Sequence, residues 1–269
     1  MTLNHQFIVD HLDAGYGDKT ILDNINIEIL AGQITSIIGA NACGKSTLLR
    51  TMSRLISPSQ GQVLLDGKSI HKMPSRQLAQ TLGLLPQSPI APEGITVGDL
   101  VSRGRHPHHG FMSRWNKTDD EAIAKALDTT KTTELIDREI DELSGGQRQR
   151  VWIAMALAQE TEILLLDEPT TFLDVTHQME VLDLLIDLNQ SQGTTIVLVL
   201  HDLNLASRYS DQLIAMRQGR IHAYGTPKNV ITEDVIQSVF GLHNQIMLDP
   251  LSGRPMVLPI GRHKITKTT

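Results

Sequence analysis

A phosphate-binding loop stands in the first fifth of the chain. Residues 39–46 fit the pattern G-x-x-x-x-G-K-[ST], with Gly39 and Gly44 at the two glycine positions. These glycines let the backbone curl until its N–H groups point at phosphate oxygens. Lys45 is expected to reach the β- and γ-phosphates of a nucleotide, and the Ser46 hydroxyl to bind Mg²⁺. The nucleotide contacts predicted from this loop are Gly39, Asn41, Gly44, Lys45, Ser46 and Thr47.

The loop needs a strand before it and a helix after it to work in this way. Residues 34–38 form an apolar run that predicts a buried strand, and a helix is expected to begin at Thr47. The N-terminus of that helix adds the positive end of its dipole to the phosphate site. A glycine-rich turn without any ligand is the alternative for the loop taken alone.

Two carboxylates follow a second buried strand. The apolar run at residues 163–166 leads directly into Asp167 and Glu168. Nucleotide sites in parallel sheets lie at the carboxyl ends of the strands. Asp167 is therefore expected to reach the Mg²⁺ held by Ser46, and Glu168 to lie near the γ-phosphate and polarise a water molecule. An exposed pair of strand-end carboxylates is the alternative reading.

A second candidate anion site precedes another helix. Ser144, Gly145, Gly146 and Gln147 lead into the helix predicted at residues 148–159. One nucleotide does not need two such sites on one chain. Two copies facing each other head to tail use both, because each phosphate loop is then closed by the other copy. In isolation, the same turn is more simply a helix cap.

The remaining pattern indicates an α/β fold. Continuous apolar runs at residues 163–166 and 195–200 are typical of parallel strands covered on both faces, and residues 25–29 predict a strand with one solvated face. Strand signals stop from about residue 93 to 145, where helices are expected at 97–104, 118–130 and 133–138, the second starting with a capping box at Thr118. We expect one domain, with a core at about 1–87 and 151–228, an inserted helical subdomain at about 88–150 and a C-terminal extension at about 229–269.

Bulk properties exclude several classes of protein. The chain has 269 residues, a formal charge of -6 and one cysteine. The acidic balance argues against nucleic acid as a partner, and a single cysteine excludes an internal disulfide and fits a reducing compartment. No apolar run reaches the length of about 18 residues that spans a membrane, and the first residues show no secretory leader. The expectation is a cytosolic protein.

Taken together, the motifs resemble the ATP-binding subunit of ABC transporters. The resemblance rests on the loop at 39–46, the sequence LSGGQ at 143–147, LLLDEP at 164–169 and His201 after the next strand. It covers nearly the whole chain and implies a P-loop NTPase (RecA-like) core with a mainly parallel sheet, an N-terminal antiparallel β part and an inserted helical subdomain. It also implies ATP and Mg²⁺ as cofactors.

The resemblance assigns roles to five further positions. It implies that Tyr16, placed in a loop by its flanking glycines, stacks on adenine. It implies that Gln87 is a catalytic residue that senses Mg²⁺ and the transport state, and that Glu168 is the catalytic base. His201 is implied to hold the γ-phosphate and the attacking water, and Asp174 to contact the partner subunit.

The chain departs from the family pattern inside the phosphate loop. The family often has Pro at position 40 and Gly at position 42, and both are Ala here. We expect nucleotide binding to survive, because Gly39 and Gly44 are present. Cys43 lies in the same loop, and two readings stay open: its alkylation blocks ATP binding sterically, or it is an inert buried thiol.

Two segments resemble one branch of the family. Residues 94–97 and 102–108, the latter containing G-R-x-P-H, resemble ATPases of iron–siderophore, haem and cobalamin importers. A ferric siderophore importer of the inner membrane is the reading we favour. The partners so implied are a second copy, integral membrane permease subunits and, indirectly, a periplasmic or surface substrate-binding protein. The chain is then peripheral on the cytoplasmic face.

The cluster His106, His108 and His109 is interpreted as a solvated loop, since no carboxylate or cysteine stands near it in sequence.

Three other functions fit the sequence less well than import. A soluble ABC ATPase of DNA repair or translation usually carries a long coiled coil or two tandem ATPase domains, and the chain shows neither. A small-molecule kinase accounts for the phosphate loop alone. An exporter commonly carries its permease in the same chain.

Overall fold

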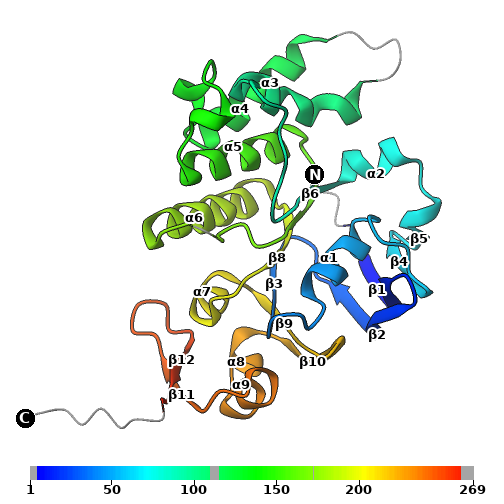
Figure 1. Cartoon of the computed structure of the whole chain (residues 1–269), viewed down its shortest axis with the longest axis vertical. Helices are drawn as coiled ribbons and strands as arrows, with labels where there is room; N and C mark the ends of the chain where they lie inside the picture. The colour runs from blue at the N-terminus through cyan, green and yellow to red at the C-terminus, as the bar shows by residue number, and fades with distance from the viewer. Residues whose placement is uncertain (1–4, 110–114, 172, 262–269) are drawn as a thin grey trace, which may run out of the picture.

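The computed structural model describes residues 5–109, 115–171 and 173–261. A central six-stranded sheet has the order β10-β9-β3-β8-β7-β6 (Figure 1). Five neighbouring strands run parallel, and β10 is antiparallel to β9 at one edge. The predicted mainly parallel sheet is confirmed. The strand bounds are β3 Ile34–Gly39, β6 Leu82–Leu85, β7 Ile163–Leu166, β8 Thr195–Val199, β9 Gln212–Arg217 and β10 Arg220–Gly225.

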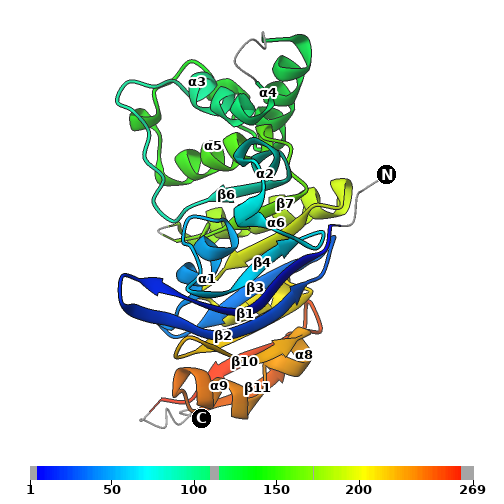
Figure 2. The ribbon, with the colours of Figure 1, turned by 90° about the vertical axis from the view of Figure 1, so that its right-hand side faces the viewer.

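The predicted N-terminal antiparallel part is a four-stranded sheet of order β2-β1-β4-β5 (Figure 2). Its strands are β1 Phe7–Tyr16, β2 Lys19–Ile29, β4 Gln60–Leu65 and β5 Lys68–Ser69. Tyr16 is the last residue of β1 and pairs with Lys19, so its predicted position in a loop is wrong. The two flanking glycines do not end the strand, because β1 continues to a tight turn at Gly17 and Asp18.

The central sheet is buried on both faces. Along β7, Ile163 and Leu165 belong to a core shared with the N-terminal sheet and helix α1 (Lys45–Met52). Leu164 and Leu166 belong to a second core shared with helices on the opposite face. Side chains alternate between the faces of a strand, so an unbroken apolar run is needed to fill both cores. This requirement explains why β7 could be predicted correctly from the sequence.

The helical insertion lies at one end of the molecule (Figure 1). Its elements are α3 Val97–Ser102, η2 Arg103–His108, α4 Lys117–Thr129, η3 Thr133–Leu135, η4 Ile140–Glu142 and α5 Gly145–Ala158. The helix expected at 133–138 is wrong: the structure has a single 3₁₀ turn there. The capping box is real but begins at Asn116, whose side chain accepts from the backbone of Thr118 and Asp119. Asn is as good an N-cap as Thr, and the earlier residue takes the role.

The G-R-x-P-H element ties this insertion to the core. Arg105 is 4% exposed, and its guanidinium donates to Asp119 at 3.0 Å and to Glu160 at 2.7 Å. Burial by itself raises the pKa of Asp119, but hydrogen bonds from Arg105 and Asn116 outweigh it and the net pKa is lowered. From helix α2 (Ser75–Thr81), Arg76 donates to the carbonyls of residues 107 and 108. The segment expected as a solvated loop is therefore a packed 3₁₀ helix.

The histidines of this segment have separate contacts. His108 contacts the carbonyl of Gln159 through Nε2 at 2.8 Å. The ring of His109 lies 3.2 Å from an Asp119 carboxylate oxygen and stacks on Trp115. The two side chains thus serve the packing of η2 against its neighbours.

The C-terminal extension braces the helix that follows His201. Helix α7 (Leu203–Tyr209) bonds to the last hairpin through Asn204, Ser207 and Arg208. Arg208 pairs with Asp249 at 2.7 Å. Hydrogen bonds from Ser252 and Arg208 lower the pKa of Asp249 to about 2, so this pair stays ionised well below neutral pH. The elements from α6 onward not yet given are α6 Val175–Gln192, α8 Pro227–Val230, α9 Glu233–Phe240, β11 Asn244–Leu248 and β12 Pro255–Pro259.

In the three described ranges, no helix is both long and apolar enough to span a bilayer. The prediction that the first residues form no secretory leader rests mostly on residues 1–4, which lie outside those ranges. Phe172, within the stretch that leads to Asp174, also lies outside them.

Candidate nucleotide site

The phosphate loop joins β3 to α1, and two of its glycines have backbone conformations that other residues rarely adopt. Gly39 has φ 156° and Gly44 has φ 107°. A Cβ atom on Gly39 would lie 2.5 Å from the carbonyl oxygen of Met216, and one on Gly44 would lie 2.9 Å from Leu22. Helix α1 begins at Lys45, two residues before the predicted start, because Gly44 already serves as its N-cap residue. Any other residue at these positions would distort the loop.

Lys45 lies across the mouth of the loop. Its ammonium donates to the carbonyl oxygens of Gly39 at 2.9 Å and Ala40 at 3.1 Å, and the residue is 5% exposed. These bonds fix the long side chain over the curled backbone. A cation held at this point is suited to neutralising phosphate oxygens that enter the loop.

Ser46 and Asp167, the two residues expected to share Mg²⁺, lie within hydrogen-bond distance of each other. The Ser46 hydroxyl donates to one Asp167 carboxylate oxygen at 2.9 Å, although the residues are 121 positions apart. Asp167 is 2% exposed, and its other oxygen has no hydrogen-bond partner. Burial raises the pKa of this carboxyl, the bond from Ser46 opposes the rise, and the neighbouring Glu168 adds to it. A hydroxyl and an unsatisfied carboxylate oxygen side by side fit a hard divalent cation such as Mg²⁺.

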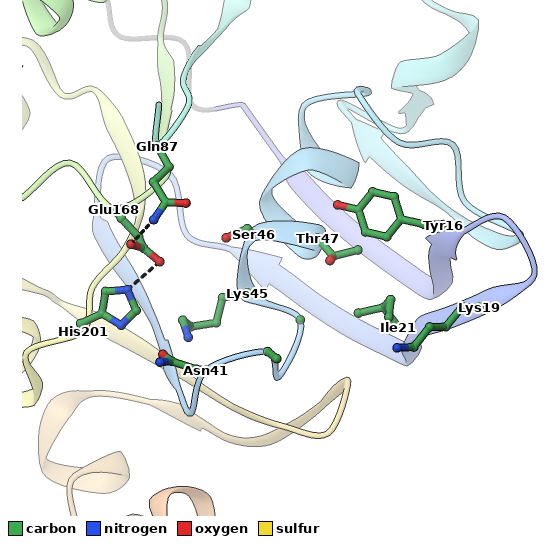
Figure 3. Close-up of a pocket in the computed structure, with 12 residues that line it drawn as sticks. Tyr16, Lys19, Ile21, Asn41, Lys45, Ser46, Thr47, Gln87, Glu168 and His201 are labelled. Carbon is green, nitrogen blue, oxygen red and sulfur yellow. Dashed lines mark hydrogen bonds and ion pairs between the residues drawn. The ribbon is translucent and has the colours of Figure 1, made fainter. Parts of the chain in front are cut away.

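Both carboxylate oxygens of Glu168 have polar partners. Gln87 donates to its Oε2 at 2.6 Å, and His201 Nε2 lies 2.6 Å from its Oε1 (Figure 3). Thr171 also donates to Oε2, at 3.0 Å. Glu168 has φ 55°, a left-handed conformation that is uncommon for this residue type and directs the backbone sharply after β7. The sequence did not predict this contact of Thr171 with Glu168, although Thr171 lies only three residues further along the chain.

A cavity of about 500 Å³ connects these groups. It extends from Glu168 and His201, past Lys45 and Ser46, to Tyr16 at its far end (Figure 3). Of the residues expected to hold the nucleotide or act in catalysis, those that line it are Tyr16, Asn41, Gly44, Lys45, Ser46, Thr47, Gln87, Glu168 and His201. Lys19, Ile21 and Ala42 line it as well and were not predicted to do so. Tyr16 is half exposed, which leaves its ring accessible for stacking.

The second candidate anion site lies elsewhere. Ser144, Gly145, Gly146 and Gln147 do not line the cavity, and neither does Asp174. The Ser144 hydroxyl accepts from the backbone of Gln147, whose side chain accepts from the backbone of Ser144, so the turn caps α5. Asp174 caps α6 through the backbone of His177. Hydrogen bonds from the backbone and then the side chain of His177 lower the pKa of Asp174.

The fold and the cavity define a P-loop nucleotide-binding ATPase. The model of the ABC transporter family matches residues 22–171, and the chain belongs to this family. It is an ATPase subunit of the transporter type. The probable siderophore transport system ATP-binding protein of Bacillus subtilis (strain 168) is 54% identical, over 93% of this chain and 91% of the relative. The ferric enterobactin transport ATP-binding protein of Escherichia coli (strain K12) is 52% identical, over 94% and 93%.

More distant similarities agree with this placement. A cobalamin import ATP-binding protein of Halobacterium salinarum is 38% identical over 94% of this chain and 63% of the relative. Among solved structures, one described as an inward-facing conformation of a putative metal-chelate type ABC transporter has a TM-score of 0.82 and 31% identity, covering 96% of this chain and 98% of that one. The dimeric structure of a bacterial ABC transporter cassette has a TM-score of 0.72 and 27% identity, over 82% and 98%.

Ala42 carries strain that glycine would relieve. Its φ is 60°, whereas Ala40, two residues earlier, has a negative φ. We expect Ala42→Gly to stabilise the fold by up to about 1 kcal/mol, because the penalty of the left-handed conformation exceeds the entropy that glycine adds to the unfolded chain. Ala40→Gly is the matched control and should destabilise by about 0.5 kcal/mol. Thermal unfolding of the three chains measures both, and an Ala42→Gly chain that melts below the parent would contradict the strain.

Cys43 is predicted to react slowly. It is 6% exposed, and burial raises the pKa of its thiol although Lys45 offsets part of the rise. Only the thiolate attacks an alkylating reagent, so at pH 7.5 the folded chain should react with iodoacetamide about tenfold more slowly than the chain in urea. The rate should rise with pH, because more thiolate forms as pH approaches the raised pKa. Equal rates in the folded and unfolded chains would show an accessible, reactive thiol instead.

Proposed function

We propose that this chain hydrolyses ATP in the presence of Mg²⁺ and powers a membrane importer of ferric siderophores. The two relatives named for siderophores share more identity with it than the relative named for cobalamin. This difference supports a siderophore over cobalamin as the transported ligand. The proposal of ATP hydrolysis rests on one observation: Gln87 and His201 both contact the Glu168 carboxylate, which lies beside the phosphate loop.

The phosphates of ATP would lie over the loop. The backbone N–H groups from Gly39 to Thr47 and the Lys45 ammonium bind and orient the β- and γ-phosphates. Ser46 and Asp167 are the residues that would hold Mg²⁺. When bound, this ion supplies positive charge to the β- and γ-phosphate oxygens. Tyr16, at the far end of the cavity, offers a ring on which adenine can stack.

Glu168 is suited to accept a proton from the attacking water. Its carboxylate is held by Gln87, Thr171 and His201, so it cannot swing away from the phosphate loop. The water between Glu168 and the γ-phosphate attacks phosphorus as its proton passes to the carboxylate, and ADP leaves. His201 reaches the same point and orients the γ-phosphate. Gln87, on the segment after β6, joins this point to the stretch at 88–110.

A second copy completes each site in this proposal. Ser144, Gly145, Gly146, Gln147 and Asp174 lie outside the cavity of their own chain. In a head-to-tail pair they close the phosphate loop of the other chain, and ATP joins the two copies. The fold similarity to a dimeric cassette supports this arrangement. Hydrolysis removes the bridging phosphate and lets the copies separate.

The stretch at 88–110 is the surface proposed to receive the permease. Its residue Ile90 is 92% exposed, so this side chain is accessible to a partner. When the two copies approach or separate, the movement is transmitted from Gln87 through residues 88–110 to a helix of the permease. The chain would then sit on the cytoplasmic face of the inner membrane, and a substrate-binding protein would deliver the iron chelate from outside.

We expect Glu168→Gln to lower ATP hydrolysis by at least about 100-fold, because a neutral amide cannot accept the proton. ATP affinity should change by less than about threefold, since Lys45 and Ser46 are untouched. Phosphate release and binding of a fluorescent ATP analogue measure the two quantities. Glu162→Gln, a carboxylate in the turn before β7, is the matched control. Retention of one-tenth or more of the parental rate would remove Glu168 from the role of base.

Uptake measurements test the transport part. Cells of the source organism that lack this chain should lose uptake of radioactive iron bound to their siderophore. Expression of the parental chain should restore this uptake, and expression of the Glu168→Gln variant should not. Labelled cobalamin and haem are followed in the same cells. Loss of cobalamin or haem uptake with iron uptake intact would contradict the proposed substrate class and leave the ATPase chemistry standing.

A further inference from the structure

We propose that His177 is a positioning residue that holds the signature turn at Gly145 and Gly146 to the loop that carries Asp174. The inference rests on the proposed function, in which both segments face a second copy of the chain. His177 lies in the first turn of α6, is not part of the phosphate loop, and does not line the cavity. Its contacts join two segments that are about 30 residues apart in sequence.

One contact is with Asp174. The backbone N–H of His177 donates to Asp174 Oδ1 at 2.9 Å, and the ring Nδ1 lies 2.8 Å from the same oxygen. An ionised carboxylate can only accept, so Nδ1 is the donor. Two hydrogen bonds thus fix the direction of the Asp174 side chain, which is 67% exposed. A carboxylate this open to water would otherwise sample several rotamers.

The other contact is with the signature turn. A Cβ atom on Gly146 would lie 2.4 Å from His177 Cδ2 and 2.9 Å from Nε2. The imidazole therefore covers the face of Gly146 from which a side chain would project. Gly146 belongs to the first turn of α5, where backbone N–H groups are free to meet an anion. The ring sets how close this turn lies to α6.

A second link continues the same interface. One turn further along both helices, Arg150 on α5 bonds to Glu180 on α6 at 2.6 Å. Figure 1 shows the two helices side by side, with α5 as the last helix of the helical insertion and α6 packed on the central sheet. The pair at Arg150 fixes the spacing of the helices, and His177 fixes their N-terminal ends. The turn at Gly145 and Gly146 and the loop that carries Asp174 are the elements that face the other copy in the proposed function. The two contacts hold these elements in a fixed position relative to each other.

The test compares His177→Ala with two variants that each keep one contact. His177→Asn keeps an N–H donor for Asp174 and loses the ring. His177→Phe keeps a ring against Gly146 and loses the donor. His222→Ala, an exposed histidine on β10, is the matched control. Each full-length chain is assayed for ATP hydrolysis over a range of protein concentrations, for binding of a fluorescent ATP analogue to dilute chains, and for melting temperature.

The protein concentration that gives half-maximal specific activity should rise about tenfold in His177→Ala, because one charge-assisted hydrogen bond and the ring contact are lost together. The Asn and Phe variants should lie between Ala and the parent. Nucleotide affinity of dilute chains should stay within about twofold, since the cavity is unchanged. A purely structural role would instead lower the melting temperature and leave the half-maximal concentration of the folded fraction unaltered.

Two outcomes separate this inference from the function on which it rests. A parental specific activity that does not depend on protein concentration would contradict the two-chain site, and the inference would fail with it. A concentration-dependent parent together with a His177→Ala chain that behaves like His222→Ala would overturn the inference alone. If Ala fails to fold, Asn and Phe variants that both match the parent would show that the residue only fills space.

Discussion

The hydrogen bond from Ser46 to Asp167 is the interaction on which the site depends. It joins the start of α1 to the end of β7, although β8 lies between β3 and β7 in the sheet. The bond requires that the strands run parallel, so that their carboxyl ends meet at one edge. The same edge then receives Gln87 after β6, Glu168 after β7 and His201 after β8. Apolar runs that fill both faces of the sheet keep these strand ends in register.

Much of this edge could be predicted from residue types and spacing. Buried parallel strands need continuous apolar residues, and the phosphate loop needs glycine at fixed positions, so β3, β7, β8 and the loop show directly in the sequence. The pairing of Ser46 with Asp167 followed from that topology. The fold class and the family were therefore within reach of the sequence, and the comparisons confirm both.

Other features depended on contacts that one segment cannot reveal. Tyr16 is in a strand because Lys19 pairs with it across a tight turn, and local glycines suggested a loop. The 3₁₀ helix at Arg105 is held by Asp119, Glu160 and α2, all distant in sequence. His177 belongs to none of the predicted motifs, and no motif predicted the contact of Thr171 with Glu168. Their roles became visible only when Glu168, Asp174 and Gly146 had positions in space.

The division of the site between cavity and surface is the central consequence of the fold. One chain places Lys45, Ser46, Gln87, Glu168 and His201 around a single cavity. Its signature turn and Asp174 lie elsewhere, on elements fixed to each other by His177 and by the pair of Arg150 with Glu180. The C-terminal hairpin braces α7 and so supports the segment that carries His201. In the proposed head-to-tail pair, these outlying elements would complete the site of a second copy.

Light scattering of Glu168→Gln with and without Mg·ATP tests this division most directly. A chain that binds ATP but hydrolyses it slowly should accumulate as a pair. The account predicts a monomer without nucleotide and a dimer, of twice the mass, when Mg·ATP is added. A chain that binds Mg·ATP with undiminished affinity and remains a monomer at every protein concentration would contradict the claim that two copies share each site.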